Sequence, residues 1–220
     1  DYYRGGANDE VTLRANVAAF QGIRLHPRVL VDVDRRDLST TILGEKLSMP
    51  VLIAPTAFHR LASPEGEIAT AAAASRVGTI MVFSSLSTTS PEEVAASTDS
   101  PLWFQLYVYK DRELTRNIIE RAELLGFKAL CVTVDAPLLG RREKDVKNRF
   151  SLPPELTIAT VGDRLAKDIA ENGENSSLNI YFENLLDQSV TWRDIDWIRS
   201  ISKLPIVLKV IQRADDALKA

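Results

Sequence analysis

The sequence predicts an α/β fold built from consecutive strand–helix units, and three observations lead to this prediction. Short apolar runs recur along the chain, helix-like segments separate them, and polar side chains follow their ends. Nearly continuous hydrophobicity is typical of strands that are buried on both faces of a parallel sheet. Strands that alternate with helices indicate βαβ units. The expected strands are 49–56 (MPVLIAPT), 78–85 (GTIMVFSS), 102–108 (LWFQLYV), 128–135 (KALCVTVD) and 204–210 (LPIVLKV).

The helix-like segments between these runs carry start and stop signals. Ser63 is the predicted N-cap of a helix whose first position is Pro64, and Ser90 with Glu93 has the spacing of a capping box. Gly126 ends a third helix, as glycines at helix C-termini commonly do. The expected helices are 63–78, 90–97, 111–126 and 191–203.

Two architectures contain such units, an open doubly wound sheet and a (βα)8 TIM barrel. An open sheet that binds a dinucleotide should carry a G-x-G-x-x-G turn after its first strand, and the sequence has none. A barrel places its chemistry at the carboxyl ends of its strands, where this sequence has hydroxyl, amide, phenol and amine groups. We therefore predict the N-terminal part of a TIM barrel, with about five βα units.

Composition excludes several classes of function. The 220 residues carry a net charge of −3 without a basic run, which argues against a nucleic-acid partner. The apolar stretches are too short to span a membrane, and no metal site is predicted. The single cysteine, Cys131, lies in an apolar run and is expected in the core. A cytoplasmic location fits, or a peroxisomal one in a eukaryote.

The chain has features of a piece of a longer protein. It begins without methionine inside what looks like an ordered motif and ends within a helical pattern. The connection between the fourth and fifth expected strands is too long for one helix. We expect a mobile loop at about 155–188, with a disordered surface insertion at 165–180 as the alternative.

One short stretch, FQLYVYKDR (104–112), indicates a binding site. Read with the period of a strand, Gln105, Tyr107 and Tyr109 point to one face, and Phe104, Leu106 and Val108 to the other. Buried amides and phenols need hydrogen-bond partners. A polar ligand is therefore expected over this face.

Several motifs resemble those of the FMN-dependent 2-hydroxy acid oxidases and dehydrogenases, the family of glycolate oxidase, lactate oxidase and the flavin domain of flavocytochrome b2. They are DYYRGGANDEVTLRAN, LSMPVLIAPTAFHRLASPEGE, FQLYVYKDR, VTVDAPLLGRREKDVKNRF and LPIVLK. The resemblance implies an FMN-binding TIM barrel that oxidises an (S)-2-hydroxy acid to the 2-oxo acid. Hydride or its equivalent would pass to flavin N5, with oxygen as the expected acceptor, giving hydrogen peroxide. It also implies a homo-oligomer when the protein is intact.

The resemblance assigns cofactor-binding roles by position. Gln105 would bond to the flavin ring, and Lys209 would sit at its N1/O2 end. An ammonium group there stabilises the reduced flavin. Without the resemblance, Lys209 could equally be a solvated lysine, and Thr133 an ordinary strand residue. The remaining cofactor contacts would be the backbone of Pro55, Thr56 and Ala57 and the hydroxyls of Ser84 and Thr133.

The resemblance also implies a substrate site. Tyr2 and Arg142 would hold the carboxylate, and Tyr107 would act at the substrate's hydroxyl, as the catalytic residue of this chain. Arginine suits a carboxylate because its fork matches two oxygens. Composition alone cannot separate Arg142 from Arg141. Leu86 stands where glycolate oxidases usually carry tryptophan, which suggests room for lactate or a larger substrate.

Some family segments have no counterpart in the sequence. The family's histidine base and its FMN phosphate loops are not found, and His59 is not expected to replace the base. Val210 stands where the family usually has glycine, and a β-branched residue is costly if φ is positive there. The isolated chain is therefore expected to be weak or inactive. The alternatives are an inactive, self-associating fragment and a different FMN-barrel enzyme.

Overall fold

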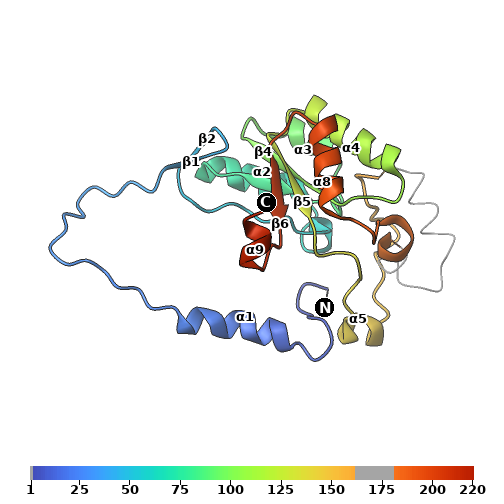
Figure 1. Ribbon diagram of the computed structural model, residues 1–220, viewed down its shortest axis with the longest axis horizontal. Helices are drawn as coiled ribbons and strands as arrows, with labels where there is room; N and C mark the ends of the chain where they lie inside the picture. The colour runs from blue at the N-terminus through green and yellow to red at the C-terminus, as the bar shows by residue number, and fades with distance from the viewer. Residues whose placement is uncertain (1, 162–180) are drawn as a thin grey trace. The chain divides into compact units, whose positions relative to one another are not determined.

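The computed structural model describes residues 2–161 and 181–220 (Figure 1). The chain divides into two compact units, and each is described by itself. The first unit joins Asp1–Asp37 to Leu139–Ser151, and the second joins Leu38–Leu138 to Leu152–Ala220. Of the expected loop at about 155–188, the stretch 162–180 lies outside the described residues.

A four-stranded parallel sheet forms the centre of the second unit. Its strands follow one another in chain order (Figure 1), and helical segments connect them. This is the arrangement of consecutive βαβ units. Four of the five expected strands are therefore confirmed. They are β3 (Met81–Phe83), β4 (Leu102–Leu106), β5 (Ala129–Thr133) and β6 (Ile206–Lys209).

The first expected strand, 49–56, is wrong as a strand. The structure keeps only an isolated parallel bridge between Ile53 and Met81, with bonds from Ile53 N to Ile80 O and from Val82 N to Ile53 O, both 2.9 Å. Pro50 and Pro55 flank the bridge, and proline has no N–H to donate to a ladder. The segment nevertheless lies beside β3, where a first barrel strand would lie.

A short antiparallel hairpin that the sequence reading missed precedes this segment. It consists of β1 (Thr40–Ile42) and β2 (Glu45–Leu47). Leu43 and Gly44 connect them with φ of 49° and 87°. Positive φ at both central residues is typical of the type I′ turn, which matches the twist of the two strands.

The helices of the second unit include the four expected ones. The capping box at α3 is present, with Glu93 N donating to Ser90 Oγ at 3.2 Å and Ser90 N to Glu93 Oε2 at 3.0 Å. The prediction that Ser63 caps α2 is wrong, because α2 begins three residues later, at Gly66. These helices are α2 (Gly66–Val77), α3 (Pro91–Ala96), α4 (Arg112–Leu124) and α8 (Trp192–Ile201); the shorter ones are η1 (His59–Leu61), η2 (Tyr181–Leu185) and α9 (Ala214–Ala217).

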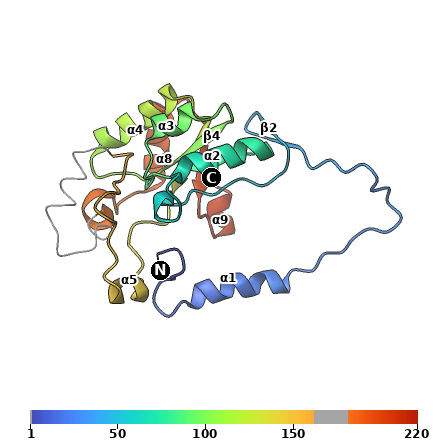
Figure 2. The same cartoon turned by 180° about the vertical axis from the view of Figure 1, so that it is seen from behind.

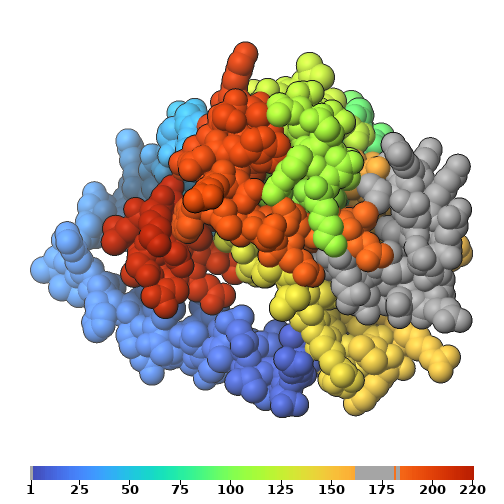
Figure 3. Space-filling model, turned by 45° about the vertical axis from the view of Figure 1, so that its right-hand side comes forward, coloured from blue at the N-terminus to red at the C-terminus, as the bar shows by residue number. Residues whose placement is uncertain are grey.

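Helices α4 and α8 lie side by side at the surface, as the green and orange segments of Figure 3 show. Arg112 at the start of α4 bonds to Asp194 at 2.7 Å, and Ser202 after α8 donates to Glu123 at 2.6 Å. The Arg112 guanidinium also lies 5.2 Å from the ring of Trp197. These polar contacts join the two helices at both ends.

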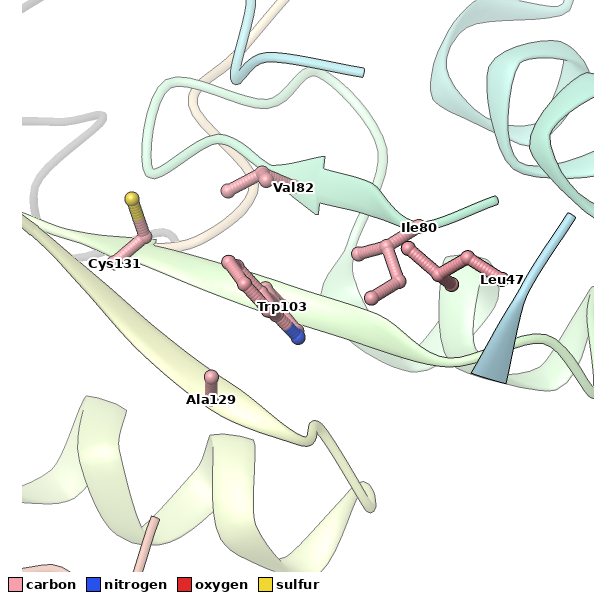
Figure 4. Close-up of a cluster of buried hydrophobic side chains, with 6 residues drawn as sticks. All are labelled: Leu47, Ile80, Val82, Trp103, Ala129 and Cys131. Carbon is pink, nitrogen blue, oxygen red and sulfur yellow. The ribbon is translucent and has the colours of Figure 1, made fainter. Parts of the chain in front are cut away.

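The two faces of the sheet carry different side chains. Phe83, Phe104 and Phe127 pack on one face with ring centroids 5.3–5.8 Å apart. On the other face the core cluster of Figure 4 includes Cys131, which is buried as predicted. Burial raises the pKa of its thiol. The full cluster is Leu47, Ile80, Val82, Trp103, Ala129 and Cys131.

The first unit contains α1 (Val11–Gly22) and α5 (Glu143–Lys147). Its two stretches meet where Asn8 N donates to Arg141 O at 2.7 Å and where Lys144 pairs with Glu10 at 3.0 Å. Among the helices of residues 2–161 and 181–220, none has the length and apolar content needed to cross a membrane.

Candidate active site

Polar side chains gather at the carboxyl ends of the parallel strands. Side chains alternate between faces along a strand, so Gln105 shares the face of Trp103, and Thr133 that of Cys131. The same alternation puts Ser84, after β3, and Lys209, in β6, on this face. We call Ser84, Gln105, Thr133 and Lys209 the polar layer. The polar layer thus continues the face of the apolar cluster in Figure 4.

Within the polar layer, Gln105 is the residue that hydrogen bonds fix most firmly. Its side chain donates through Nε2 to Thr133 Oγ1 at 3.0 Å and accepts from Ser85 N at 3.0 Å. Ser85 Oγ also donates to the Gln105 backbone oxygen at 2.5 Å. Gln105 is only 2% exposed. The structure therefore brings the predicted residues Gln105 and Thr133 together and fixes the orientation of the amide.

Two loops follow the chain segments at this end of the sheet, one after the bridged residue Ile53 and one after β3. The first loop is residues 54–61 and contains Pro55, Thr56 and Ala57. The second loop is residues 84–90 and contains Ser84, whose Oγ accepts from Leu86 N at 3.1 Å. Phe58 N donates to Leu86 O at 3.0 Å, so the two loops touch. Leu86 is only 4% exposed.

Lys209 faces Thr133 across the β5–β6 pair. Val134 N donates to Lys209 O at 3.3 Å, which continues the pairing by one residue. Val210 follows with a φ of 78°. The condition under which a β-branched residue is costly at this position, a positive φ, is therefore met.

Tyr107 and Thr133 line a small cavity of about 60 Å³. Typical ligand pockets measure about 300–1,000 Å³. The described residues therefore supply a recess beside the polar layer and not a complete pocket. The remaining lining residues are Val108, Val134, Ala136, Pro137, Leu186, Asp187, Gln188 and Val190.

Tyr109 differs from the half-buried Tyr107, because its hydrogen-bond partner is a protein side chain and not the expected ligand. Its side chain is fully buried, and its hydroxyl lies 2.5 Å from that of Tyr181. Burial raises the pKa of Tyr109. The strand ends at Leu106, so strict alternation no longer applies three residues later.

Tyr2 and Arg142 lie together in the first unit, although 140 positions separate them. The Arg142 guanidinium carbon is 4.8 Å from the Tyr2 ring centroid, and Nη1 donates to Tyr2 O at 3.2 Å. Arg142 also pairs with Asp145 at 3.6 Å. Burial raises the pKa of Tyr2, and Arg142 partly opposes this effect. Arg141 instead pairs with Glu143 at 3.0 Å.

The sequence reading missed Glu67, in the first turn of α2. This carboxylate is fully buried and bonds to both the first loop and the second loop. Two signals could have revealed it: an acidic residue just after a helix start, and the run of hydroxyls in SSLSTTS. His59, one of the two histidines, has its Nδ1 3.0 Å from Thr70 Oγ1.

The polar layer fits the polar edge of a flavin, which accepts hydrogen bonds and gains negative charge on reduction. It offers an ammonium, an amide and two hydroxyls. A family model described as FMN-dependent dehydrogenase matches residues 1–220. The chain belongs to this family.

Curated relatives support the assignment. The L-lactate oxidase of Nostoc sp. is 52% identical over 224 residues, which cover 100% of this chain and 61% of the relative. The glycolate oxidase of Spinacia oleracea is 50% identical over 218 residues, covering 99% and 58%. The chain thus spans about three fifths of the length of these relatives.

Solved structures give the same result for the fold. Mandelate oxidase with (S)-4-hydroxymandelic acid matches with a TM-score of 0.92 and 33% identity, covering 100% of this chain and 61% of that one. A flavocytochrome b2 variant with bound sulfite matches with a TM-score of 0.81 and 36% identity, covering 100% and 50%. The predicted partial TIM barrel and FMN as the family's cofactor are therefore confirmed, and the family is one of oxidoreductases.

Proposed function

We propose that the protein carries out FMN-dependent oxidation of an (S)-2-hydroxy acid to the corresponding 2-oxo acid. The observation that supports this most is the polar layer, because it lies at the carboxyl ends of the strands, where a TIM barrel has its active site. Gln105 and Thr133 are already joined there at 3.0 Å, across neighbouring strands.

The polar layer would hold the flavin ring. Gln105 uses one of the two N–H groups of its amide on Thr133, so the other can donate to a ring oxygen. Ser84 accepts from Leu86 N and keeps its own hydroxyl hydrogen for a ligand. Pro55, Thr56 and Ala57 would contact the ring through their backbone. When bound, FMN supplies the acceptor for the hydride equivalent that leaves the substrate.

Lys209 would stabilise negative charge at the N1/O2 end of the ring. Its place is fixed by its pairing opposite Thr133 in the sheet. A charge held in place before the reaction needs no reorganisation when charge develops, and this lowers the barrier.

Tyr107 and the Tyr2–Arg142 pair would bind the substrate. Arg142 holds its guanidinium at Tyr2 with the help of Asp145, which limits the conformations of a long side chain. Such an arginine can orient a carboxylate through two parallel bonds. Tyr107 would contact the substrate hydroxyl, so the Cα hydrogen faces the ring.

The substrate side chain would be that of lactate or a larger acid, because Leu86 leaves more room than a tryptophan. Relatives named as lactate and mandelate oxidases support this size of substrate, and one named as glycolate oxidase supports the 2-hydroxy acid class. We further propose oxygen as the acceptor, a homo-oligomeric assembly, and a cytoplasmic or, in a eukaryote, peroxisomal location.

The test is a visible spectrum of the purified protein after incubation with FMN and removal of free flavin. Anaerobic L-lactate should then bleach the retained flavin, and such bleaching would overturn the expectation, drawn from the sequence, that the isolated chain is weak or inactive. Arg142→Met should raise the lactate concentration needed for half-maximal bleaching at least tenfold, whereas the neighbouring Arg141→Met should not. If no flavin is retained, the proposal fails for this chain, and the inactive self-associating alternative gains support.

A further inference from the structure

Glu67 is a fully buried carboxylate with donors from two separate parts of the chain. His59 N in the first loop donates to its Oε1 at 3.1 Å. From the second loop, Thr88 N donates at 2.9 Å and Thr89 Oγ1 at 2.7 Å. Thr88 Oγ1 adds contacts of 3.0 and 3.1 Å to the two oxygens. One side chain therefore satisfies polar groups of both loops.

The two loops also bond to each other around Glu67. Phe58 N donates to Leu86 O at 3.0 Å, and Arg60 N donates to Thr88 Oγ1 at 3.2 Å. Thr88 thus links the first loop to the carboxylate as well. The loops and the carboxylate form one connected network. A shift of either loop would therefore break its hydrogen bonds to the other loop and to Glu67.

The start of α2 packs closely against both loops. Gly66, beside Glu67, has a φ of +57°, and a Cβ there would lie 2.8 Å from Arg60 Cγ and 3.2 Å from Thr89 Oγ1. Only glycine combines this conformation with such a close approach. In Figure 2 the turn at residues 59–61, in cyan, lies at the beginning of α2. Glu67 is therefore held where both loops meet.

The carboxylate is in its charged form at neutral pH. Burial alone would raise the pKa of Glu67, but the bonds from Thr89, Thr88 and His59 outweigh it and lower the pKa. Hydrogen bonds to an ionised acceptor are about twice as strong as neutral ones. The network is thus centred on a buried negative charge that N–H and O–H donors stabilise.

We propose that Glu67 is a positioning residue for the flavin site. It fixes the first loop relative to the second loop, and these loops carry Pro55–Ala57 and Ser84. This inference rests on the proposed function, because it concerns the same cofactor. Glu67 itself does not take part in the chemistry.

Amide hydrogen exchange tests the network without FMN. Glu67→Gln keeps the size of the side chain but replaces one acceptor by an NH₂ donor, which faces donors. Exchange should accelerate at His59 and Thr88, in both loops. The matched control is Glu93→Gln, which removes a carboxylate bonded to Ser90 in the same second loop. It should accelerate exchange near Ser90 only. Faster exchange in one loop alone for Glu67→Gln would overturn the proposal.

FMN binding tests the consequence for the site. Glu67→Gln should weaken FMN affinity about tenfold and change the visible circular dichroism of the bound flavin. A loss of one or two buried hydrogen bonds corresponds to a factor of this size. Thr89→Val should act in the same direction, and Thr89→Ser, which keeps the hydroxyl, should restore affinity and spectrum.

The outcomes separate the two proposals. If the unsubstituted protein binds FMN, and Glu67→Gln does so with equal affinity and an identical dichroism spectrum, the positioning role is wrong while the proposed function stands. If the unsubstituted protein binds no FMN, the proposed function fails for this chain, and the positioning role fails with it.

Discussion

The same face of one sheet has two very different layers. Toward the amino ends of the strands lies the apolar cluster, with Trp103 at its centre and Leu47 from the hairpin against it (Figure 4). Toward the carboxyl ends lies the polar layer, where Gln105 bonds to Thr133. The apolar cluster and the polar layer are only two positions apart on β4, at Trp103 and Gln105.

The difference shows how one strand can serve stability and function at once. The apolar cluster stabilises the fold by removing hydrocarbon from water, which requires size and shape but no exact partner. The polar layer gains little from burial, since each polar group must keep its bond. It costs stability unless its network is complete. The apolar cluster should therefore respond to changes in volume, and the polar layer to changes in hydrogen bonding.

The largest effect should come from the centre of the apolar cluster. Trp103→Ala is expected to lower the free energy of unfolding by about 3–5 kcal/mol, because it removes a large buried side chain and leaves a cavity. Urea denaturation measures this loss. Trp103→Phe is the control. The indole Nε1 is buried without a partner among the described residues, so its removal should cost far less. Equal losses for both substitutions would contradict this view of the cluster.

The next effect concerns the polar layer. Gln105→Leu should lower the free energy of unfolding by about 1–3 kcal/mol, because Ser85 N and Thr133 Oγ1 lose their partner while they stay buried. FMN affinity, measured by quenching of flavin fluorescence, should fall as well. Gln105→Glu keeps an acceptor for Ser85 N and should be milder in stability. An unchanged stability for Gln105→Leu would show that volume alone matters here too.

A smaller effect, of opposite sign, is expected at Val210. Its φ of 78° is unfavourable for a residue with a branched Cβ. Val210→Gly should therefore raise the free energy of unfolding by about 1 kcal/mol, net of the greater chain entropy of glycine. Val210→Ala retains a Cβ and should gain less. A loss of stability in Val210→Gly would mean that the valine side chain contributes more through packing than its conformation costs.

The smallest effect is a pH dependence that comes from Glu67 and that the apolar cluster, which contains no carboxylate, should not contribute to. The pKa of Glu67 is lower in the folded protein than in the unfolded chain, so its contribution is complete above the unfolded value of about 4.3. That contribution is lost as the pH falls through the folded pKa. Urea denaturation from neutral to acid pH should therefore show a smaller stability difference between the unsubstituted protein and Glu67→Gln at acid pH. A difference that stays constant across this range would contradict the assignment.

Much of the second unit follows from sequence pattern. Nearly continuous apolar runs predicted β3, β4, β5 and β6, because buried parallel strands must be hydrophobic on both faces. The same runs predicted that polar residues at their ends would meet, as Gln105 and Thr133 do. The motif register chose Arg142 over Arg141, and Arg142 is the one that contacts Tyr2.

Other features could not be deduced from pattern. Pro50 and Pro55 limit the first expected strand to a single bridge between Ile53 and Met81. Whether any pairing forms there depends on the position of β3. Tyr109 turns to Tyr181, 72 positions away, after the strand has ended. Glu67 looks like an ordinary acidic residue in a first helical turn until both loops surround it.

The sequence by itself determined the four strands of the parallel sheet, the four main helices around them and their order. It also determined the family and the identity of the polar residues at the strand ends. These depend on local periodicity and on motifs, which are properties of neighbouring residues. Only the tertiary structure decided which polar groups far apart along the chain are partners. It joined Tyr2 to Arg142 and made Glu67 the link between two loops. Hydrogen bonds over such separations depend on distances and angles that the folded chain alone sets.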